Sequence, residues 1–345
     1  MLRLIDANLN RLSEGLRVLE DMARFMLSDS NLSARLKELR HRLSEGNPSI
    51  RTALLSSRDP SQDVGAFAAD AMHRNGVPDI VAANARRVTE SLRVLEEFAK
   101  LPESALDPET FKKARFTMYD IERELMGRVL RRGRRIQGLY VIIDPDMLGQ
   151  RDEAETCRQA IRGGARVVQL RDKGRDRRVV LASARRLGEA CHDADVPFIV
   201  NDYADIVIAS AADGLHLGQG DLPLPEARRM LPIDRLIGCT VRTAEQAQRA
   251  EAEGADYVAV GAMYPTRSKE QPEVVGLERL RQVRESVLLP LVAIGGINAG
   301  NAADVMNAGA DAVAVMSAVI QTDDVEQAAR SIAEKVRQHN GQDNS

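Results

Sequence analysis

A stretch of alternating polar residues follows one short apolar segment in the second half of the chain. It reads Gln169-Leu170-Arg171-Asp172-Lys173. Alternate side chains of an extended strand share a face, so we expect Gln169, Arg171 and Lys173 to point to one side. A guanidinium group and an ammonium group on the same face suit a polyanionic ligand such as a phosphate ester.

Two carboxylates come directly after the next two strand-like segments. Asp202 follows Asn201, and Asp221 comes a few residues after His216. Two carboxylates beside two cations can hold Mg2+ and bridge it to a diphosphate. The alternative is that both aspartates only cap the helices that follow them. For His216, a structural role and a substrate contact are both open.

Hydroxyl groups and glycines after three later segments indicate a second anion site. In a barrel, the turns after the seventh and eighth strands commonly bind a phosphate through backbone N–H groups. One diphosphate site and one monophosphate site predict transfer of an alkyl-type group with release of pyrophosphate. No Cys–His or Ser–His–Asp group is evident at a strand end, so covalent catalysis is not expected. The residues are Thr266-Arg267-Ser268-Lys269, Gly295-Gly296 and Met316-Ser317.

Eight short β-branched segments must position these residues. They alternate with helical patterns, which requires parallel pairing with crossovers. Eight such units in roughly 200 residues predict a closed (β/α)8 TIM barrel, whose active site lies at the carboxyl ends of the strands. The predicted strands are 139–143, 166–170, 198–200, 214–217, 236–239, 257–260, 291–294 and 312–315.

The first part of the chain contains an internal repeat. Residues 7–20 match residues 83–96 at a constant offset of 76, with nine of fourteen positions identical. Apolar residues recur every three or four positions in both copies, which predicts an amphipathic helix. With second helices at 32–45 and 111–130, the repeat predicts a small all-α helical bundle of two hairpins, joined by a loop at 56–65.

The basic stretch 131–135 is expected to be a solvated linker, with a helical domain at 1–133 and an α/β barrel domain at 134–345. A nucleic-acid patch there is disfavoured, because the net charge is -3 and aromatic residues make up 3% with no Trp.

The chain has no apolar segment approaching about 18 residues and no secretory signal, so we expect a cytoplasmic protein that does not bind membranes. The three cysteines lack metal-site or disulfide spacing, and each is expected to be a small buried side chain.

These motifs resemble the thiamine-phosphate synthase (thiamine-phosphate pyrophosphorylase) family over about Gly138 to Val336. That family uses Mg2+ to join 4-amino-2-methyl-5-hydroxymethylpyrimidine diphosphate to thiazole phosphate, giving thiamine phosphate and pyrophosphate. The resemblance rests on the order and spacing of Gln169-Leu170-Arg171-Asp172-Lys173, Asn201-Asp202, His216-Leu217-Gly218-Gln219-Gly220-Asp221, Pro265-Thr266-Arg267-Ser268-Lys269 and Ile294-Gly295-Gly296-Ile297.

The resemblance implies a role for each matched residue. Asp202 and Asp221 would hold Mg2+. The catalytic cations would be Arg171, Lys173 and Lys269. Gln169, Arg171, Lys173, Asn201 and Lys269 would contact the pyrimidine diphosphate, and Thr266, Ser268, Gly296, Met316 and Ser317 the thiazole phosphate. Further substrate contacts would be Leu170, Asp172 and Arg267.

One segment departs from the family pattern. Where the family usually has Gly-x-Ser-x-His, this chain has Gly238-Cys239-Thr240-Val241-Arg242. Thr240 keeps the hydroxyl group and is retained as a diphosphate contact. Arg242 replaces His, and its side chain could contact a phosphate or face the solvent.

The N-terminal repeat resembles a helical domain that is fused to this synthase in other proteins and is proposed to be an alternative hydroxymethylpyrimidine phosphate kinase. It lacks a Gly-x-x-x-x-Gly-Lys loop. A kinase activity and a packing or homo-oligomerisation role are therefore both open, and salt-bridged helix faces would explain Arg17 and Arg93 without a ligand. The repeated polar residues are Asn8 and Asn84, Arg11 and Arg87, Glu14 and Glu90, and Arg17 and Arg93.

Two competing functions share the barrel. A thiazole tautomerase would use the same thiazole-phosphate site but would not need the diphosphate cluster that this chain retains. A non-catalytic thiamine-phosphate sensor would bind its ligand without turnover. In every case the expected partners are phosphorylated small molecules.

Overall fold

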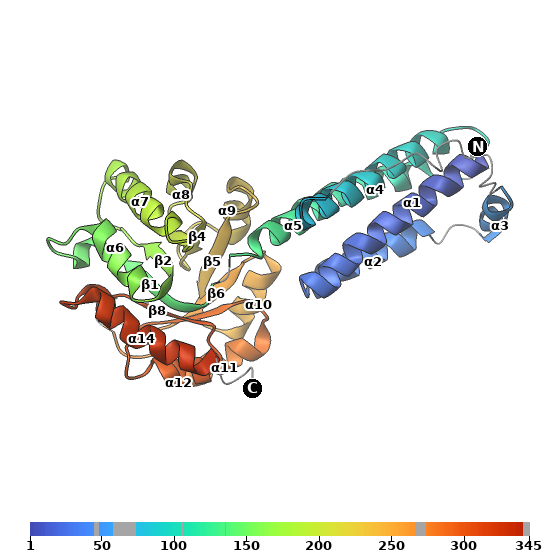
Figure 1. The fold of residues 1–345 in the computed structure, drawn as a ribbon. Helices are drawn as coiled ribbons and strands as arrows, with labels where there is room; N and C mark the ends of the chain where they lie inside the picture. Colours follow the sequence, from blue (N-terminus) through green and yellow to red (C-terminus); the bar gives the residue numbers. More distant parts are fainter. Residues whose placement is uncertain (45–47, 58–73, 105, 135, 267–273, 341–345) are drawn as a thin grey trace. The chain divides into compact units, whose positions relative to one another are not determined.

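The computed structural model describes residues 1–44, 48–57, 74–104, 106–134, 136–266 and 274–340 (Figure 1). The chain divides into two compact units, Met1–Gly133 and Arg134–Ser345. No helix among the described residues is both long enough and apolar enough to cross a membrane.

The first unit is built from helices. They are α1 (Leu2–Asp21), a π-helical turn (Met22–Met26), α2 (Ser30–Ser44), α3 (Pro48–Ser56), α4 (Val77–Ala99) and α5 (Pro108–Arg131). α1 packs against α2 and α4, and α4 packs against α5. The two copies of the repeat are thus helical, as predicted.

The apolar side chains that recur along the repeat form the core of this unit. Leu16 of α1 and Leu92 of α4 are fully buried, and they occupy equivalent positions in the two copies. Gly15 allows the close approach of α1 to α4, because a Cβ atom there would lie 2.8 Å from Val88 Cγ2 and 3.2 Å from the carbonyl oxygen of Asn84. The amphipathic pattern therefore specified the packing face of each helix.

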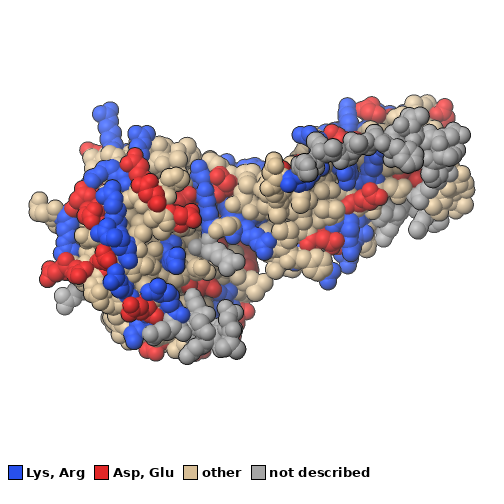
Figure 2. Space-filling model, viewed as in Figure 1, with Lys and Arg blue, Asp and Glu red and all other residues tan. Residues whose placement is uncertain are grey.

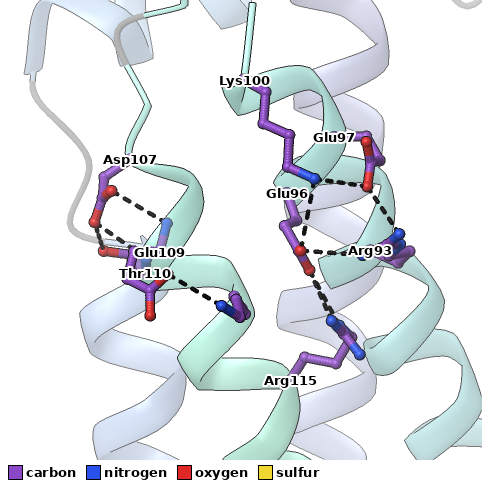
Figure 3. Close-up of polar contacts among 9 residues, drawn as sticks. Arg93, Glu96, Glu97, Lys100, Asp107, Glu109, Thr110 and Arg115 are labelled. Atoms are coloured by element: carbon purple, nitrogen blue, oxygen red, sulfur yellow. Dashed lines mark hydrogen bonds and ion pairs between the residues drawn. The ribbon is translucent and has the colours of Figure 1, made fainter.

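Polar side chains hold the ends of α4 and α5 (Figure 3). Asp107 caps α5 by accepting hydrogen bonds from the backbone amides of Glu109 and Thr110, each at 3.1 Å. The buried Glu96 of α4 accepts hydrogen bonds from Arg115 of α5 at 3.0 Å and from Arg93 at 3.0 Å.

Three expectations for this unit need correction. α3 was not predicted, and Ser56, expected to begin a loop, is its last residue; residues 58–65 of that loop lie outside the described part. Arg131, expected in a solvated linker, instead ends α5 and is buried. α5 continues through Gly127 to Arg131, and Arg132 is its C-cap residue.

The second unit is a closed barrel of eight parallel strands in chain order, as predicted. The strands are β1 (Gly138–Ile143), β2 (Ala165–Leu170), β3 (Phe198–Asn201), β4 (Gly214–Leu217), β5 (Leu236–Val241), β6 (Tyr257–Val260), β7 (Leu291–Ile294) and β8 (Ala312–Val315). The helices are α6 (Glu153–Arg162), α7 (Arg177–His192), α8 (Ala204–Ser210), α9 (Leu224–Met230), α10 (Ala244–Ala252), α11 (Gly276–Ser286), α12 (Ala302–Asn307), α13 (Ser317–Ile320) and α14 (Val325–Asn340), with a 3-10 turn at Pro145–Met147.

Side chains alternate between two apolar layers. One layer fills the inside of the barrel and includes Tyr140, Val167 and Tyr257, while the other lies between strands and helices. Gly238 is required beside Tyr257, because a Cβ atom there would lie 2.0 Å from the tyrosine Cζ. The interior below the strand ends is therefore packed, and the open space lies above it.

Candidate active site

A pocket opens at the carboxyl ends of the barrel strands, and all eight strands contribute to it. Its volume is about 90 Å³. Apolar side chains of the strands line it together with the charged side chains of Arg171, Lys173, Asp202 and Asp221. The lining residues are Tyr140, Ile142, Gln169, Arg171, Lys173, Asn201, Asp202, His216, Gly218, Asp221, Thr240, Tyr257, Ala259, Val292, Ile294 and Ala314.

The three alternating polar residues of the β2 motif lie in this pocket, as expected from strand geometry. Gln169 is 4% exposed, accepts a hydrogen bond from the Tyr140 hydroxyl at 2.7 Å and donates one to Asn201 Oδ1 at 2.9 Å. Both ends of the buried amide are thus satisfied, so Gln169 and Asn201 are held in fixed orientations.

The hydrogen-bond chain continues across the barrel floor. Tyr140 and Tyr257 hydroxyls lie 3.2 Å apart, and the Tyr257 hydroxyl lies 3.1 Å from His216 Nδ1. His216 Nε2 lies 3.0 Å from Thr240 Oγ1. Burial raises the pKa of both tyrosines, which keeps them neutral. His216 thus connects Tyr257 to Thr240 and also lines the pocket, so a structural role and a substrate contact both stay predictions.

Lys173, Asp202 and Asp221 form a charged cluster at the mouth of the pocket. Lys173 Nζ lies 3.0 Å from Asp202 Oδ2, and Asp202 and Asp221 both line the pocket beside it. Burial and the neighbouring Asp221 raise the pKa of Asp202. Burial acts in the same direction on Asp221, but hydrogen bonds from Asp202 and from the Gly218 amide outweigh it and lower the pKa of Asp221. The two carboxyl groups therefore influence each other's ionisation, with the pKa of Asp202 above and that of Asp221 below the usual value.

The alternative role of these two aspartates as helix caps is wrong. The residue that precedes α8 is Tyr203, and the residue that precedes α9 is Pro223. Asp221 instead accepts a hydrogen bond from the Gly218 amide at 2.6 Å, inside its own turn. Both carboxylates are therefore turned toward the pocket rather than toward helix ends.

Asp144 is a pocket-side residue that the sequence interpretation missed. It directly follows β1, is 3% exposed and forms an ion pair with Arg171. It also accepts a hydrogen bond from the Asp146 amide at 3.2 Å. The rule that selected Asp202, a carboxylate immediately after a barrel strand, would have found Asp144 as well. Tyr140 and Tyr257 were not predicted as site residues, because an aromatic residue within a strand pattern predicts a buried core position.

The structure does not bring Leu170 and Asp172 to the pocket. Leu170 is buried in the apolar layer between strands and helices. Asp172 is 3% exposed and pairs with Arg175 Nε at 2.6 Å. Both face away because they alternate with Gln169 and Arg171 along the same strand.

Of the residues expected to bind the second phosphate, the described ones follow β6, β7 and β8 and are not among the residues that line the pocket. Gly295 and Gly296 have φ of 100° and 68°, which favours glycine. A Cβ atom at Gly296 would lie 2.7 Å from Tyr264 Cβ, so the loop after β7 packs on the segment leading to Thr266. Met316 and Ser317 begin α13, while Arg267, Ser268 and Lys269 lie outside the described residues.

The segment with the unusual sequence after β5 contributes one side chain to the pocket. Thr240 lines it, whereas the side chain of Arg242 is exposed and its backbone amide donates to Gln246 Oε1 at 2.7 Å. Burial raises the pKa of Cys239 to about 12, so its thiol stays protonated at neutral pH. Cys157 and Cys191 are buried as expected, but Cys239 is only partly buried.

Asp202 and Asp221 fit a magnesium ion by the chemistry of their donor atoms. Among the residues that the structure describes, no group of three His, Cys, Asp or Glu side chains could hold a metal. Mg2+ is commonly bound by one or two carboxylates together with phosphate oxygens and water. A pair of carboxylates beside Lys173 and Arg171 meets that requirement once a phosphorylated ligand is present.

The chain matches known proteins in both units. Residues 139–319 match the family model described as thiamine monophosphate synthase, and residues 3–124 match the ThiD2 family. The thiamine-phosphate synthase of Thermosynechococcus vestitus is 39% identical over 97% of this chain and 95% of its own length. That of a Synechocystis strain is 38% identical over 94% of this chain and 93% of its own length.

A solved structure matches more than half of this chain. The thiamine phosphate pyrophosphorylase of Pyrococcus furiosus is 38% identical and superposes with a TM-score of 0.55, covering 59% of this chain and 96% of its own. The similarity to that protein is thus confined to a part of this chain about the size of the barrel.

Proposed function

Because this chain belongs to the thiamine monophosphate synthase family, we propose that its barrel joins 4-amino-2-methyl-5-hydroxymethylpyrimidine diphosphate to thiazole phosphate, producing thiamine phosphate and pyrophosphate. The observation that carries the proposal is the pocket cluster of Arg171, Lys173, Asp202 and Asp221 beside the fixed amides of Gln169 and Asn201. A tautomerase would not need this cluster, and a ligand sensor would tolerate the loss of Asp202 better than an enzyme.

The cations of the pocket act on the leaving group. Arg171 and Lys173 stabilise negative charge that builds on the departing pyrophosphate, and Asp144 keeps the Arg171 guanidinium in place. Lys269 is proposed to add a third positive charge. Mg2+ held by Asp202 and Asp221 would neutralise part of the same charge when bound.

The remaining pocket groups position the substrates rather than exchange protons with them. Gln169 and Asn201 would hold the pyrimidine diphosphate, and Thr240 would contact its phosphates. Thr266, Ser268, Gly296, Met316 and Ser317 would place the thiazole phosphate so that the thiazole nitrogen attacks the methylene carbon as pyrophosphate leaves. Catalysis then consists of orientation plus leaving-group electrostatics.

The test supplies the full-length protein with both substrates and Mg2+ and follows the products by mass spectrometry. We expect thiamine phosphate and pyrophosphate in equal amounts. Binding of thiazole phosphate with neither product would overturn the proposal and favour the tautomerase or the sensor. Measuring isomerisation of the thiazole substrate in the same samples separates those two.

For the first unit we propose a kinase that phosphorylates the pyrimidine monophosphate to the diphosphate that the barrel consumes. The match to the ThiD2 family over residues 3–124 supports this function. The full chain should convert ATP and pyrimidine monophosphate to ADP and pyrimidine diphosphate. No conversion, together with a concentration-dependent change in mass in solution, would favour the homo-oligomerisation role instead.

A further inference from the structure

The first unit contains a groove between α1 and α4 that the barrel chemistry does not use. Its volume is about 570 Å³, within the roughly 300–1,000 Å³ typical of small-molecule sites. Asn8 and Arg11 come from α1, and most of the other walls come from α4. The lining residues are Asn8, Arg11, Arg74, Asp79, Ala82, Ala83, Arg86, Arg87, Glu90, Ser91 and Val94.

The groove is basic although the chain as a whole is acidic. Four arginines and two carboxylates line it, which leaves two positive charges in excess, whereas the net charge of the chain is -3. None of these arginines forms an ion pair with any residue in the described part of the chain. Figure 2 shows basic side chains on the surface of this unit.

The internal repeat provides a comparison within the same fold. Arg17 and Arg93 are equivalent, and each forms ion pairs with carboxylates of its own helix. Arg11 and Arg87 are also equivalent, but both line the groove without such a partner. Salt-bridged helix faces therefore explain the first pair of repeated arginines and leave the second pair unexplained.

Two of the residues that line the groove differ between the two copies of the internal repeat. Ala82 and Arg86 of α4 occupy the positions that Asp6 and Asn10 hold in α1, where Asn10 donates a hydrogen bond to Asp6 at 3.2 Å. In α4 the small side chain of Ala82 and the cation of Arg86 take the place of the hydrogen-bonded pair Asp6 and Asn10. The groove therefore gains both volume and positive charge at these positions.

The floor of the groove is polar and rigid. Ser91 is 3% exposed and Asn8 is 6% exposed, and both line the groove. The Asn8 side chain is fixed by a hydrogen bond to the Leu4 carbonyl at 2.9 Å. Buried hydroxyl and amide groups beneath several guanidinium groups suit the oxygen atoms of a phosphate.

We propose that this groove binds a phosphorylated small molecule, with Arg11, Arg86 and Arg87 contacting its phosphate. The inference deepens the function proposed for the first unit, since a kinase for a phosphorylated substrate requires such a site. It does not depend on phosphoryl transfer being observed.

The experiment measures chemical modification of arginines in the full-length protein by phenylglyoxal, resolved by peptide mass spectrometry. The probes are inorganic phosphate and inorganic pyrophosphate, with sodium chloride at matched ionic strength as the control. When the probe concentration is about ten times its dissociation constant, phenylglyoxal should modify Arg11, Arg86 and Arg87 about tenfold more slowly than without the probe. Arg17 and Arg93, on the same helices, serve as internal reference sites and should be unaffected.

A variant tests whether the three arginines act together. Arg87→Gln should abolish the protection of Arg11 and Arg86, whereas the matched Arg93→Gln should leave it intact; circular dichroism would confirm that both variants remain helical. Absence of protection, equal protection by chloride, or equal slowing at Arg93 would overturn the proposal. Stronger protection by phosphate would indicate a monoester ligand, and stronger protection by pyrophosphate a diphosphate ligand.

The readout separates this inference from the proposed function. Because modification is measured at each arginine without turnover, a protected groove in a protein with no kinase activity contradicts only the kinase. Kinase activity with no protection at the groove contradicts only the groove as its binding site.

Discussion

Asp202 and Asp205 lie three residues apart and illustrate how position relative to the strand end determines a residue's role. Asp202 follows β3 at once and lies in the charged cluster with Lys173 and Asp221. Asp205 is exposed on α8 and lies 3.9 Å from Arg177. The same side chain is thus part of the pocket at one position and of the surface at the other.

We expect Asp202→Asn to reduce turnover by roughly 10²-fold, the scale of losing one electrostatic contact to developing charge. The Mg2+ concentration needed for half-maximal rate should rise. Thiazole phosphate binding should change little, because its proposed contacts come from other strands. Steady-state kinetics over a Mg2+ series and calorimetric binding measure the two effects. Asp205→Asn is the matched control, and an equal loss of turnover and thiazole phosphate binding would contradict the metal assignment.

The hydroxyl of Tyr257 links Tyr140 to His216 inside the barrel. Tyr257→Phe keeps the ring and should destabilise the barrel by about 1–3 kcal/mol, because two buried polar groups each lose a partner. Urea unfolding checks this value. Tyr203→Phe is the control in the same unit: it keeps the ring that packs against Arg177 and removes a hydroxyl group that has no hydrogen bond among the described residues, so stability should change by less than about 0.5 kcal/mol. If both variants changed the free energy of unfolding equally, the hydrogen bonds of Tyr257 inside the barrel would contribute no stability.

At the scale of elements, the helical unit depends on one buried carboxylate between α4 and α5. Burial raises the pKa of Glu96, but the hydrogen bond and charge of Arg115, with the charges of Arg93 and Lys100, outweigh burial and lower it below its usual value of 4.5. Glu97, the next residue along α4, pairs with Arg93 and Lys100 at the surface. Figure 3 shows how these side chains converge.

The lowered pKa of Glu96 predicts a pH dependence of stability. Its contribution is fully present above the unfolded pKa near 4.5 and is lost as the pH falls through the lower pKa of the folded state. The free energy of unfolding of the first unit should therefore fall on acidification below about pH 4.5.

A pair of variants tests that assignment. In Glu96→Gln the unit should be less stable at neutral pH by several kcal/mol, roughly 3–5, and the acid-dependent loss should shrink. Glu97→Gln should cost less than about 1 kcal/mol. Thermal unfolding between pH 3 and pH 7 measures both, and a steep acid transition retained in Glu96→Gln would show that another group controls it.

At the scale of the whole molecule, the barrel pocket and the groove of the first unit each lie within a single compact unit. All the pocket residues fall within Arg134–Ser345, and all the groove residues fall within Met1–Gly133. The match to the Pyrococcus furiosus protein covers 96% of that protein but 59% of this chain.

We therefore expect the fragment 134–345 to retain synthase turnover within about threefold of the full chain, since no pocket residue is removed. The kinase activity proposed for the first unit should be absent from the fragment. Product formation by mass spectrometry measures both activities. Loss of synthase turnover in a fragment with native circular dichroism would show that the first unit contributes to the barrel site.

The sequence by itself determined the elements of this protein. Apolar periodicity in residues 7–20 and 83–96 predicted two helices, and β-branched segments in strict alternation with helical patterns predicted eight parallel strands. Those strands occur within one or two residues of the predicted bounds. These features could be predicted because they depend on neighbours along the chain, and strand alternation alone directed Gln169, Arg171 and Lys173 to one side.

Only the tertiary structure decided how side chains from different elements meet. Alternation also directed Leu170 and Asp172 away from the pocket, yet the pairing of Asp172 with Arg175 became evident only from the structure. The links of Asp144 to Arg171 and of Tyr140 to Gln169 join the neighbouring strands β1 and β2, the hydrogen-bond chain from Tyr140 through Tyr257 to His216 crosses the barrel, and the groove requires α1 beside α4. Distances between residues far apart in sequence follow from barrel closure and helix packing, which no local pattern encodes.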